Sequence, residues 1–151
     1  MILIVDDTVQ LRHVLERILR LEGYDRLLLA DSAQHAFDQI GLGGDGSQPV
    51  VIPDLILMDI RMPGMDGIAA CRLIKETPVY ADVPIVMITA EESVANLHAA
   101  FHAGAMDFIR KPYNQVELLA RVRSALILRG EINRRVALEQ ELAALRLRLD
   151  G

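Results

Sequence analysis

The sequence predicts an α/β fold of the (βα)5 type, a doubly wound parallel sheet of five strands with an extended C-terminal helix. Between residues 2 and 130, short apolar runs alternate with segments of helical period. The runs at 2 to 5 and 55 to 58 are apolar at every position, as expected of parallel strands that helices cover on both faces. Each of these runs is followed by an aspartate, at the predicted carboxyl edge of the sheet.

In the first part of the chain, periodicity and capping residues define two strand and helix pairs. Apolar residues recur at helical spacing from Leu11 to Leu19, and Gly23 closes that helix. Ser32 is the predicted N-cap of the next helix, which ends by Gly41. The first three predicted strands are residues 2 to 5, 26 to 30 and 55 to 58.

In the second part, a proline and polar caps set the helix limits. The third helix begins near Asp66 and ends before Pro78, because proline removes a backbone donor and disfavours helical geometry at the preceding residue. Asn114, with Glu117 three residues later, resembles a capping box that opens the fifth helix. The remaining predicted elements are a strand at 84 to 88, a helix from Glu91 to Ala103 and a strand at 106 to 109.

Two segments fall outside this alternation. Residues 41 to 49 are glycine-rich but lack the terminal Lys-Ser/Thr of a P-loop, so a flexible surface loop is favoured over a phosphate cradle. Residues 131 to 149 are charged, and their leucines alternate between spacings of four and three, which is typical of a coiled coil. We therefore expect a domain at 1–130 and a coiled-coil-like linker or dimerisation segment at 131–151, with pairing between chains favoured over packing on the same domain. The leucines are Leu138, Leu142, Leu145 and Leu149.

Composition argues against several classes of protein. A chain of 151 residues, 52% hydrophobic and 25% charged, is typical of one soluble globular domain. The net charge of -5 argues against a nucleic-acid surface on this segment. No apolar run approaches the roughly 20 residues of a transmembrane helix, and the start of the chain does not resemble a signal peptide. We expect a cytoplasmic protein without a membrane role.

Cysteine and histidine offer little chemistry in this sequence. Cys71 is the single cysteine and lies in an apolar run, so a buried, inert thiol is expected. His98 and His102 have a spacing that can bind zinc, but no glutamate follows His98 as in a zincin and no third ligand is evident. Exposed or partner-facing histidines are therefore expected.

Three carboxylates are predicted to converge at the carboxyl edge of the sheet. Asp6 and Asp7 follow the first strand, and Asp59 follows the third. Carboxylates that share a site repel one another unless a cation lies between them, and hard oxygen ligands suit Mg²⁺. With a divalent ion to neutralise the incoming group, a carboxylate can act as a nucleophile toward a phosphoryl donor.

Two further residues could serve that reaction. Lys111 is a candidate for additional positive charge, and Thr89, at the end of the fourth strand, can donate a hydroxyl hydrogen bond. The peptide bond before Pro112 is expected to be trans, whereas a cis bond would place Lys111 over the site. The alternatives are a solvated lysine, and a threonine that only caps the following helix.

Taken together, these motifs resemble the receiver domain of two-component response regulators over nearly all of residues 2 to 128. Each motif alone is weak, but the set is highly specific. The resemblance implies a flavodoxin-like sheet with strand order 2-1-3-4-5. The motifs are Asp6-Asp7, MDIRMPGMDG at 58 to 67, Thr89-Ala90 and the segment 104 to 112 that ends in Lys111-Pro112.

The resemblance also implies a role for each site residue. Asp59 is implied as the acceptor of a phosphoryl group from a histidine kinase, and Phe108 as an aromatic that changes rotamer on activation, although Phe108 could simply belong to the core. The face of the fourth helix, fifth strand and fifth helix is implied as a homodimer surface. The implied Mg²⁺ ligands are Asp6, Asp7, Asp59 and the backbone carbonyl of Arg61, and the implied phosphate-sensing groups are Thr89 and Lys111.

Some features depart from the family pattern, and other functions stay open. Thr8 stands where an acidic or amide residue is frequent, and the loop at 41 to 53 is long. One alternative is a structural module whose coiled coil dimerises regardless of phosphate. Another is a Mg²⁺-dependent aspartyl phosphatase, but such enzymes usually carry a second aspartate where Arg61 stands. We expect no enzymatic activity beyond the chain's own phosphorylation and dephosphorylation, and any output module to lie outside this chain.

Overall fold

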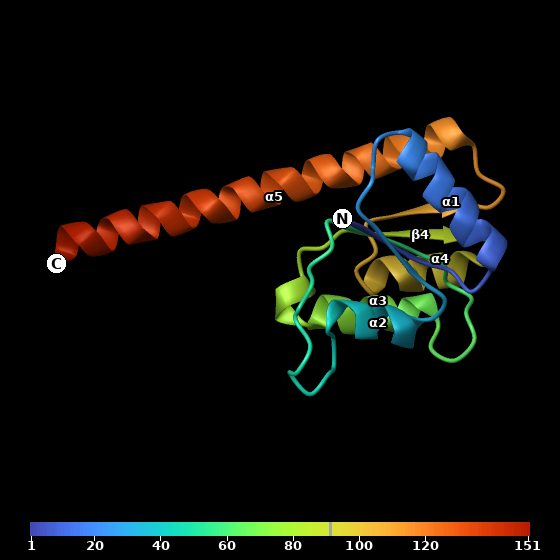
Figure 1. Cartoon of the computed structure of the whole chain (residues 1–151), viewed down its shortest axis with the longest axis horizontal. Helices are drawn as coiled ribbons and strands as arrows, with labels where there is room; N and C mark the ends of the chain where they lie inside the picture. The colour runs from blue at the N-terminus through green and yellow to red at the C-terminus, as the bar shows by residue number, and fades with distance from the viewer. Residues whose placement is uncertain (91) are drawn as a thin grey trace.

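Five parallel strands form one sheet in the order β2-β1-β3-β4-β5, which confirms the predicted doubly wound topology (Figure 1). A computed structural model describes residues 1–90 and 92–151. Every residue of β1, β3 and β4 is buried, in agreement with their continuous apolar sequence. The strands are β1 (Ile2–Val5), β2 (Leu27–Ala30), β3 (Leu55–Met58), β4 (Ile85–Thr89) and β5 (Asp107–Arg110).

Helices cover both faces of the sheet. One core cluster joins alternate strand residues such as Leu3 to α2, α3 and α4, and a second joins residues such as Ile4 to α1 and α5. Figure 1 shows the same division, with α1 and α5 on one side of the strands and the other three helices opposite. The helices are α1 (Val9–Leu21), α2 (Ala33–Ile40), α3 (Gly67–Glu76), the 3-10 turn η1 (Pro78–Tyr80), α4 (Val94–His102) and α5 (Gln115–Asp150).

The predicted caps are present at the helix ends. Ser32 Oγ accepts from the His35 N–H at 3.1 Å at the start of α2, and Asp66 Oδ1 accepts from the Ala69 N–H at 2.8 Å at the start of α3. Gly41 ends α2 with φ of +80°, and a Cβ there would lie 2.7 Å from the Pro49 carbonyl oxygen. These contacts explain why the helix limits were readable from the sequence.

The fifth helix begins with only half of the predicted capping box. Asn114 Oδ1 accepts from the Val116 N–H at 2.7 Å and from the Glu117 N–H at 3.4 Å. The Glu117 carboxylate instead accepts from Arg121 Nε at 3.4 Å, one turn further along α5. The start of the helix is confirmed at Asn114.

Other limits differ from the prediction by one to three residues. Strands β4 and β5 each lie one residue later than predicted, so that β4 includes Thr89. Helix α4 begins at Val94, because the Ser93 hydroxyl accepts from the Asn96 N–H at 3.3 Å and caps it there. The predicted start of this helix, Glu91, lies outside the described residues. The turn η1 was not predicted.

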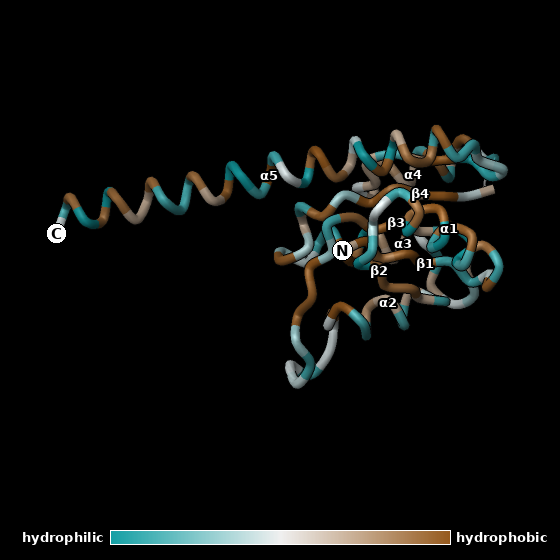
Figure 2. Tube along the Cα trace, turned by 45° about the horizontal axis from the view of Figure 1, so that its top comes forward, coloured by the Kyte–Doolittle hydropathy of each residue, from teal (hydrophilic) through white to brown (hydrophobic). Residues whose placement is uncertain are grey.

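Helix α5 runs without a break through residue 130 and projects well beyond the sheet (Figure 1). Residues 133 to 150 are all exposed, and polar and apolar residues alternate along this part of the helix (Figure 2). Residues 43 to 50 are also exposed, as predicted for the glycine-rich loop. Among the described residues, none of the helices combines the length and apolar character needed to cross a bilayer.

Candidate functional site

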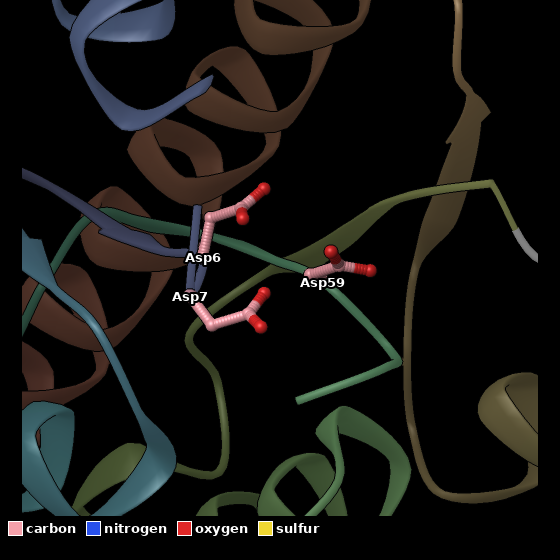
Figure 3. A group of neighbouring side chains, drawn as sticks. All are labelled: Asp6, Asp7 and Asp59. Carbon is pink, nitrogen blue, oxygen red and sulfur yellow. The ribbon is translucent and has the colours of Figure 1, made fainter. Parts of the chain in front are cut away.

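The three predicted carboxylates meet at the carboxyl edge of the sheet. Asp6 and Asp7 follow β1, Asp59 follows β3, and one carboxylate oxygen of each lies within 4.8 Å of the others (Figure 3). Asp6 and Asp59 are 2% and 8% exposed, whereas Asp7 is open to solvent. β1 and β3 are neighbours paired from Ile2–Leu55 to Val5–Met58, and this register brings the acids together. In the described part of the chain, this is the only such cluster of potential metal ligands.

Lys111 lies over two of these carboxylates. Its Nζ donates to Asp6 Oδ2 at 2.9 Å and to Asp59 Oδ2 at 3.0 Å. Burial lowers the pKa of Lys111, but the hydrogen bonds and attraction of the two aspartates outweigh this effect, so the pKa lies above that of an ordinary lysine. The Lys111–Pro112 peptide bond is cis, which is the alternative to the expected trans bond. Lys111 is therefore a charged member of the site and not a solvated lysine.

Backbone and arginine contacts that the sequence analysis did not identify hold the acids in place. Asp6 Oδ1 accepts from the Thr8 N–H at 2.9 Å, and the Asp6 carbonyl accepts from Arg12 Nη1 at 2.6 Å. Asp59 Oδ1 accepts from the Arg61 N–H at 3.3 Å. The bonds from the Thr8 and Arg61 N–H groups could have been predicted from the sequence, because an aspartate side chain commonly accepts from the N–H two residues later. The Arg12 contact depends on how α1 returns over β1.

Gly67 allows the start of α3 to approach the site closely. Its N–H donates to the Ile60 carbonyl at 2.7 Å. A Cβ at this position would lie 2.0 Å from the Asp59 carbonyl oxygen, so that only glycine fits without a shift of the backbone. Asp66, the cap of α3, directly precedes it. The glycine thus fixes the loop that leaves Asp59.

Thr89 and Phe108 lie on the other side of β3. Thr89 is the fully buried last residue of β4, the strand next to β3, and the Lys111 N–H donates to its carbonyl at 2.9 Å. Phe108 is half-buried on β5, in an edge-to-face contact with Phe101 of α4 at 5.7 Å between ring centroids. Arg110 lies 5.8 Å from the Phe108 ring. Thr89 therefore borders the acidic site, whereas Phe108 links β5 to α4.

An open cleft of about 470 Å³ lies beside the acids, between the loop after β3 and α4. Asp7 and Arg61 line it together with Asp66 and Asn96. Through this cleft the exposed carboxylate of Asp7 can be reached from solvent. The site therefore has one buried side, at Asp6 and Asp59, and one open side.

The donor set fits a hard divalent cation. Three carboxylates and one ammonium leave the site with a net charge of -2, which a divalent ion balances. All of the acidic donors are oxygens, and one of them is accessible for an ion to enter. The chemistry of the cluster thus supports metal binding.

The other reactive residues lie elsewhere, as predicted. His98 and His102 are exposed and contact each other, with ring centroids 4.4 Å apart, at a distance from the acidic cluster along α4. Cys71 is buried in the core, and burial raises the pKa of its thiol to about 11. The burial confirms the prediction of a buried cysteine, and a thiol with this pKa is largely protonated at neutral pH, so its low reactivity stays a prediction.

Comparison with known proteins identifies the family. Residues 2–123 match the model of the response regulator receiver domain. The chain belongs to this family. Membership confirms the resemblance inferred from the acidic pair, the segment around Asp59 and Lys111-Pro112.

Individual relatives and solved structures agree with this assignment. The chain is 42% identical over 128 residues to the transcriptional regulatory protein YvrH of Bacillus subtilis, covering 83% of this chain and 48% of YvrH. It is 37% identical over 130 residues to the DNA-binding response regulator MtrA of Mycobacterium tuberculosis, covering 83% and 50%. The receiver domain of NtrX from Brucella abortus superposes with a TM-score of 0.70 at 32% identity, covering 83% of this chain and 98% of that one. The chain spans about half the length of these two curated relatives.

Proposed function

We propose that this receiver accepts a phosphoryl group on Asp59 from the phosphohistidine of a histidine kinase. The observation that supports this most directly is the meeting of three carboxylates and Lys111 at one edge of the sheet. Asp59 directly follows the central strand β3, with the acids that follow β1 on one side and Thr89 of β4 on the other. This position between the other two acids and Thr89 supports Asp59 as the acceptor.

In this reaction a carboxylate oxygen of Asp59 forms a P–O bond while the P–N bond of the phosphohistidine breaks, and the electron pair returns to the imidazole nitrogen. Asp6, Asp7, Asp59 and the backbone carbonyl of Arg61 are the proposed Mg²⁺ ligands. Bound Mg²⁺ would supply positive charge for the transferred oxygens. Lys111 supplies the protein's own positive charge, already aimed at Asp59.

The proposed switch uses Thr89 and Lys111 to detect the phosphoryl group. Each residue would make a charge-assisted hydrogen bond to the phosphoryl group, worth about 1.5 to 3 kcal/mol. Two such bonds approach the ~5.5 kcal/mol needed to shift an equilibrium between inactive and active conformations from 1:99 to 99:1. Movement of Thr89 displaces the start of the β4–α4 connection, and the contact between Phe101 and Phe108 joins α4 to β5. We propose Phe108 as the residue that changes rotamer, so that the change reaches the α4–β5–α5 face.

The proposed partners are a histidine kinase and a second copy of this chain. Homodimerisation would use the α4–β5–α5 face, the C-terminal helix, or both. We propose a receiver domain at 1–130 and a transmitting segment at 131–151, in the cytoplasm, with no nucleic-acid contact by this segment. The names of YvrH and MtrA suggest a transcriptional output in a longer protein, because both relatives are about twice the matched length. The chain itself would catalyse only its own phosphorylation and dephosphorylation.

Incubation with a small phosphoryl donor and Mg²⁺, followed by intact mass measurement, tests this function. The native chain should gain one phosphoryl group and Asp59→Asn should gain none. Asp25→Asn, which changes an exposed acid of the loop before β2, is the matched control and should react like the native chain. Equal labelling of Asp59→Asn and the native chain would exclude Asp59 as the acceptor.

A phosphate-independent dimer remains a second candidate, because the distal leucines of α5 are exposed. Light scattering on the native chain and Asp59→Asn, with and without Mg²⁺ and beryllofluoride, distinguishes the two functions. A change of mass in the native chain alone supports the phosphorylation switch. A dimer of constant mass in all samples supports the structural module.

A further inference from the structure

The distal half of α5 carries an apolar stripe that the single chain leaves uncovered. Its leucines are between 48% and 85% exposed, and residues 133 to 150 contribute no buried side chain. From 128 to 149 the helix is about 30 Å long, and a helix without tertiary contacts is only marginally stable in water. The stripe consists of Leu138, Leu142, Leu145 and Leu149.

The same spacing continues toward the domain. Counting back from Leu149 in alternating steps of four and three leads through residues 135, 131, 128 and 124 to Arg121. Arg121 Nη1 donates to Asp107 Oδ2 of β5 at 2.6 Å, so this side of α5 borders β5. The leucine stripe and the β5 side of α5 therefore form one continuous seam along the helix.

We propose that residues 128 to 149 form a parallel, in-register, two-stranded coiled coil with a second copy of this chain, along this seam. The proposal rests on the proposed function, since it specifies the homodimer partner named there. In heptad notation the seam places leucines at a and d positions at 128, 138, 142, 145 and 149.

Charges beside the seam match this arrangement. In a parallel pair, each g residue faces the e residue five positions later in the partner. Arg134 then faces Glu139 of the second copy, and Glu141 faces Arg146. Symmetry repeats each pair, which gives four attractive contacts and no repulsive one among these residues. Arg134 also pairs with Glu131 in the single chain, so Glu139 of the second copy would compete for it.

The position of the seam on the β5 side of α5 also favours a parallel pair. Because the seam continues the β5 side of α5, one two-fold axis can run through both the helices and the two domains. In an antiparallel pair the domains would lie at opposite ends of the coiled coil, and the β5 sides could not meet. If Leu142 of one chain faced Leu145 of an antiparallel partner, Glu141 would lie closest to Arg148 of that partner and not to its Arg146.

Two polar residues interrupt the seam near the domain. Glu131 occupies a d position and Arg135 the following a position. Polar residues at such positions lower stability but specify register. In the parallel in-register pair, Glu131 faces Glu131 and Arg135 faces Arg135 of the second copy, and the opposite charges one layer apart offset this repulsion only in part. These two layers therefore lower the stability of the coiled coil near the domain, and its alignment is set by the leucines and the flanking charges.

Disulfide formation tests orientation and register in the full chain. In a parallel in-register pair, residue 149 faces its own copy, so Leu149→Cys should form a disulfide-linked dimer under mild oxidation. Leu147→Cys is the matched control, because Leu147 is comparably exposed but lies away from the seam. The native Cys71 is buried and should not interfere. Failure of Leu149→Cys to crosslink, or equal crosslinking of both variants, would overturn the proposal.

Charge exchange gives an independent test. Glu141→Arg should raise the dimer dissociation constant about tenfold, since it turns two attractive contacts into repulsive ones. Adding Arg146→Glu should restore the native constant, whereas adding Arg148→Glu should not. Rescue by Arg148→Glu instead would indicate an antiparallel pair and overturn the proposal. Phosphorylation of Asp59 is measured separately, so failure of the coiled coil and failure of the phosphoacceptor role are distinguishable.

Discussion

Lys111 connects parts of the chain that are far apart in sequence. Its ammonium group joins Asp6, 105 residues away, to Asp59, 52 residues away. All three side chains are largely removed from water, where an unpaired charge is costly. The lysine therefore supplies part of the positive charge that the acidic cluster needs before any metal is bound.

Lys111→Met should destabilise the metal-free protein. Its loss leaves Asp6 and Asp59 without their cation, which we expect to lower the free energy of unfolding by about 1 to 3 kcal/mol. Added Mg²⁺ should recover part of this loss, because it binds the folded carboxylates and neutralises them. Urea unfolding in EDTA and in Mg²⁺ measures both effects.

The control for this variant is Arg110→Met, which removes an exposed cation one residue earlier. It should change the free energy of unfolding by no more than about 0.5 kcal/mol in either buffer. An equal loss for Lys111→Met with and without Mg²⁺ would show that lysine and metal do not share the carboxylates.

Cys71 gives the protein a specific sensitivity to alkaline pH. Burial raises the pKa of its thiol from 9.0 to about 11. The unfolded thiol loses its proton near pH 9, while the folded thiol keeps it until about pH 11. The stabilisation is therefore complete below pH 9 and lost as pH rises to 11, a change of about 2 to 3 kcal/mol.

Cys71→Ala should remove this part of the pH dependence. Its free energy of unfolding should fall less between pH 9 and 11 than that of the native chain, although its value at pH 7 should be somewhat lower because a buried side chain is truncated. The buried Tyr80 and the partly buried Tyr113, whose pKa values are raised, titrate in both proteins, and so does Lys75, whose pKa is lowered chiefly by burial. The difference between the two curves therefore reports the thiol together with its interaction with Lys75. Parallel curves would contradict the assignment.

At the scale of single residues, the sequence predicted the charged groups of the site better than the residues that hold those groups in place. The aspartates and Lys111 follow strands at one sheet edge, and that rule places them together regardless of their distance in sequence. The contact of Arg12 with the Asp6 carbonyl, and the need for glycine at 67, depend on the angle at which a helix approaches a strand. Periodicity does not encode that angle.

At the scale of elements, the most predictable segments were those whose limits are set locally. β1 and β3 are apolar throughout, and α2 and α3 have side-chain caps, so their bounds were read almost correctly. The turn η1 is a single 3-10 turn of three residues, too short for periodicity to reveal. Tyr80, its last residue, is held by a bond to the Ile40 carbonyl at 2.6 Å, a contact between distant elements.

The junction of β3 and α3 is the element contact on which the site depends most. Gly67→Ala should force α3 away from the loop after Asp59, because the new Cβ would meet the Asp59 carbonyl. We expect a loss of about 2 to 4 kcal/mol in the free energy of unfolding. Phosphoryl incorporation with Mg²⁺ should also slow, since Asp59 would be displaced. Urea unfolding and timed mass measurements check both outcomes.

Gly44→Ala is the matched control, because a Cβ at residue 44 would meet nothing within 4 Å. It should change stability by no more than about 0.5 kcal/mol and leave the phosphorylation rate unchanged. If Gly67→Ala and Gly44→Ala were equally stable and equally reactive, the close approach of α3 would not be required.

At the scale of the whole molecule, α5 joins two ends that differ in character. The acidic site lies at the carboxyl ends of the strands, whereas the distal part of α5 leaves from the opposite end of the sheet (Figure 1). Between them, α5 packs on the core through Leu118, Val122 and Ala125 and pairs with β5 through Arg121. A change at β5 can therefore alter the position of the whole helix without any contact between the site and the distal leucines.

Removal of residues 131 to 151 tests whether the domain and the distal helix are separable. The buried residues of α5 end at Ala125, and residues 133 to 150 are exposed, so the shortened chain should stay folded. We expect its free energy of unfolding to change by no more than about 1 kcal/mol at a concentration where both chains are monomeric. Asp59 should accept a phosphoryl group at the native rate, and dimerisation through the distal helix should be lost.

The control is a truncation after residue 117, which also deletes Leu118, Val122 and Ala125 and should unfold the domain because one face of the sheet loses its cover. Circular dichroism, urea unfolding and light scattering on both truncations separate the two effects. If removal of residues 131 to 151 alone unfolded the chain or abolished phosphorylation of Asp59, the distal helix would be part of the receiver itself, and the boundary at 130 would be wrong.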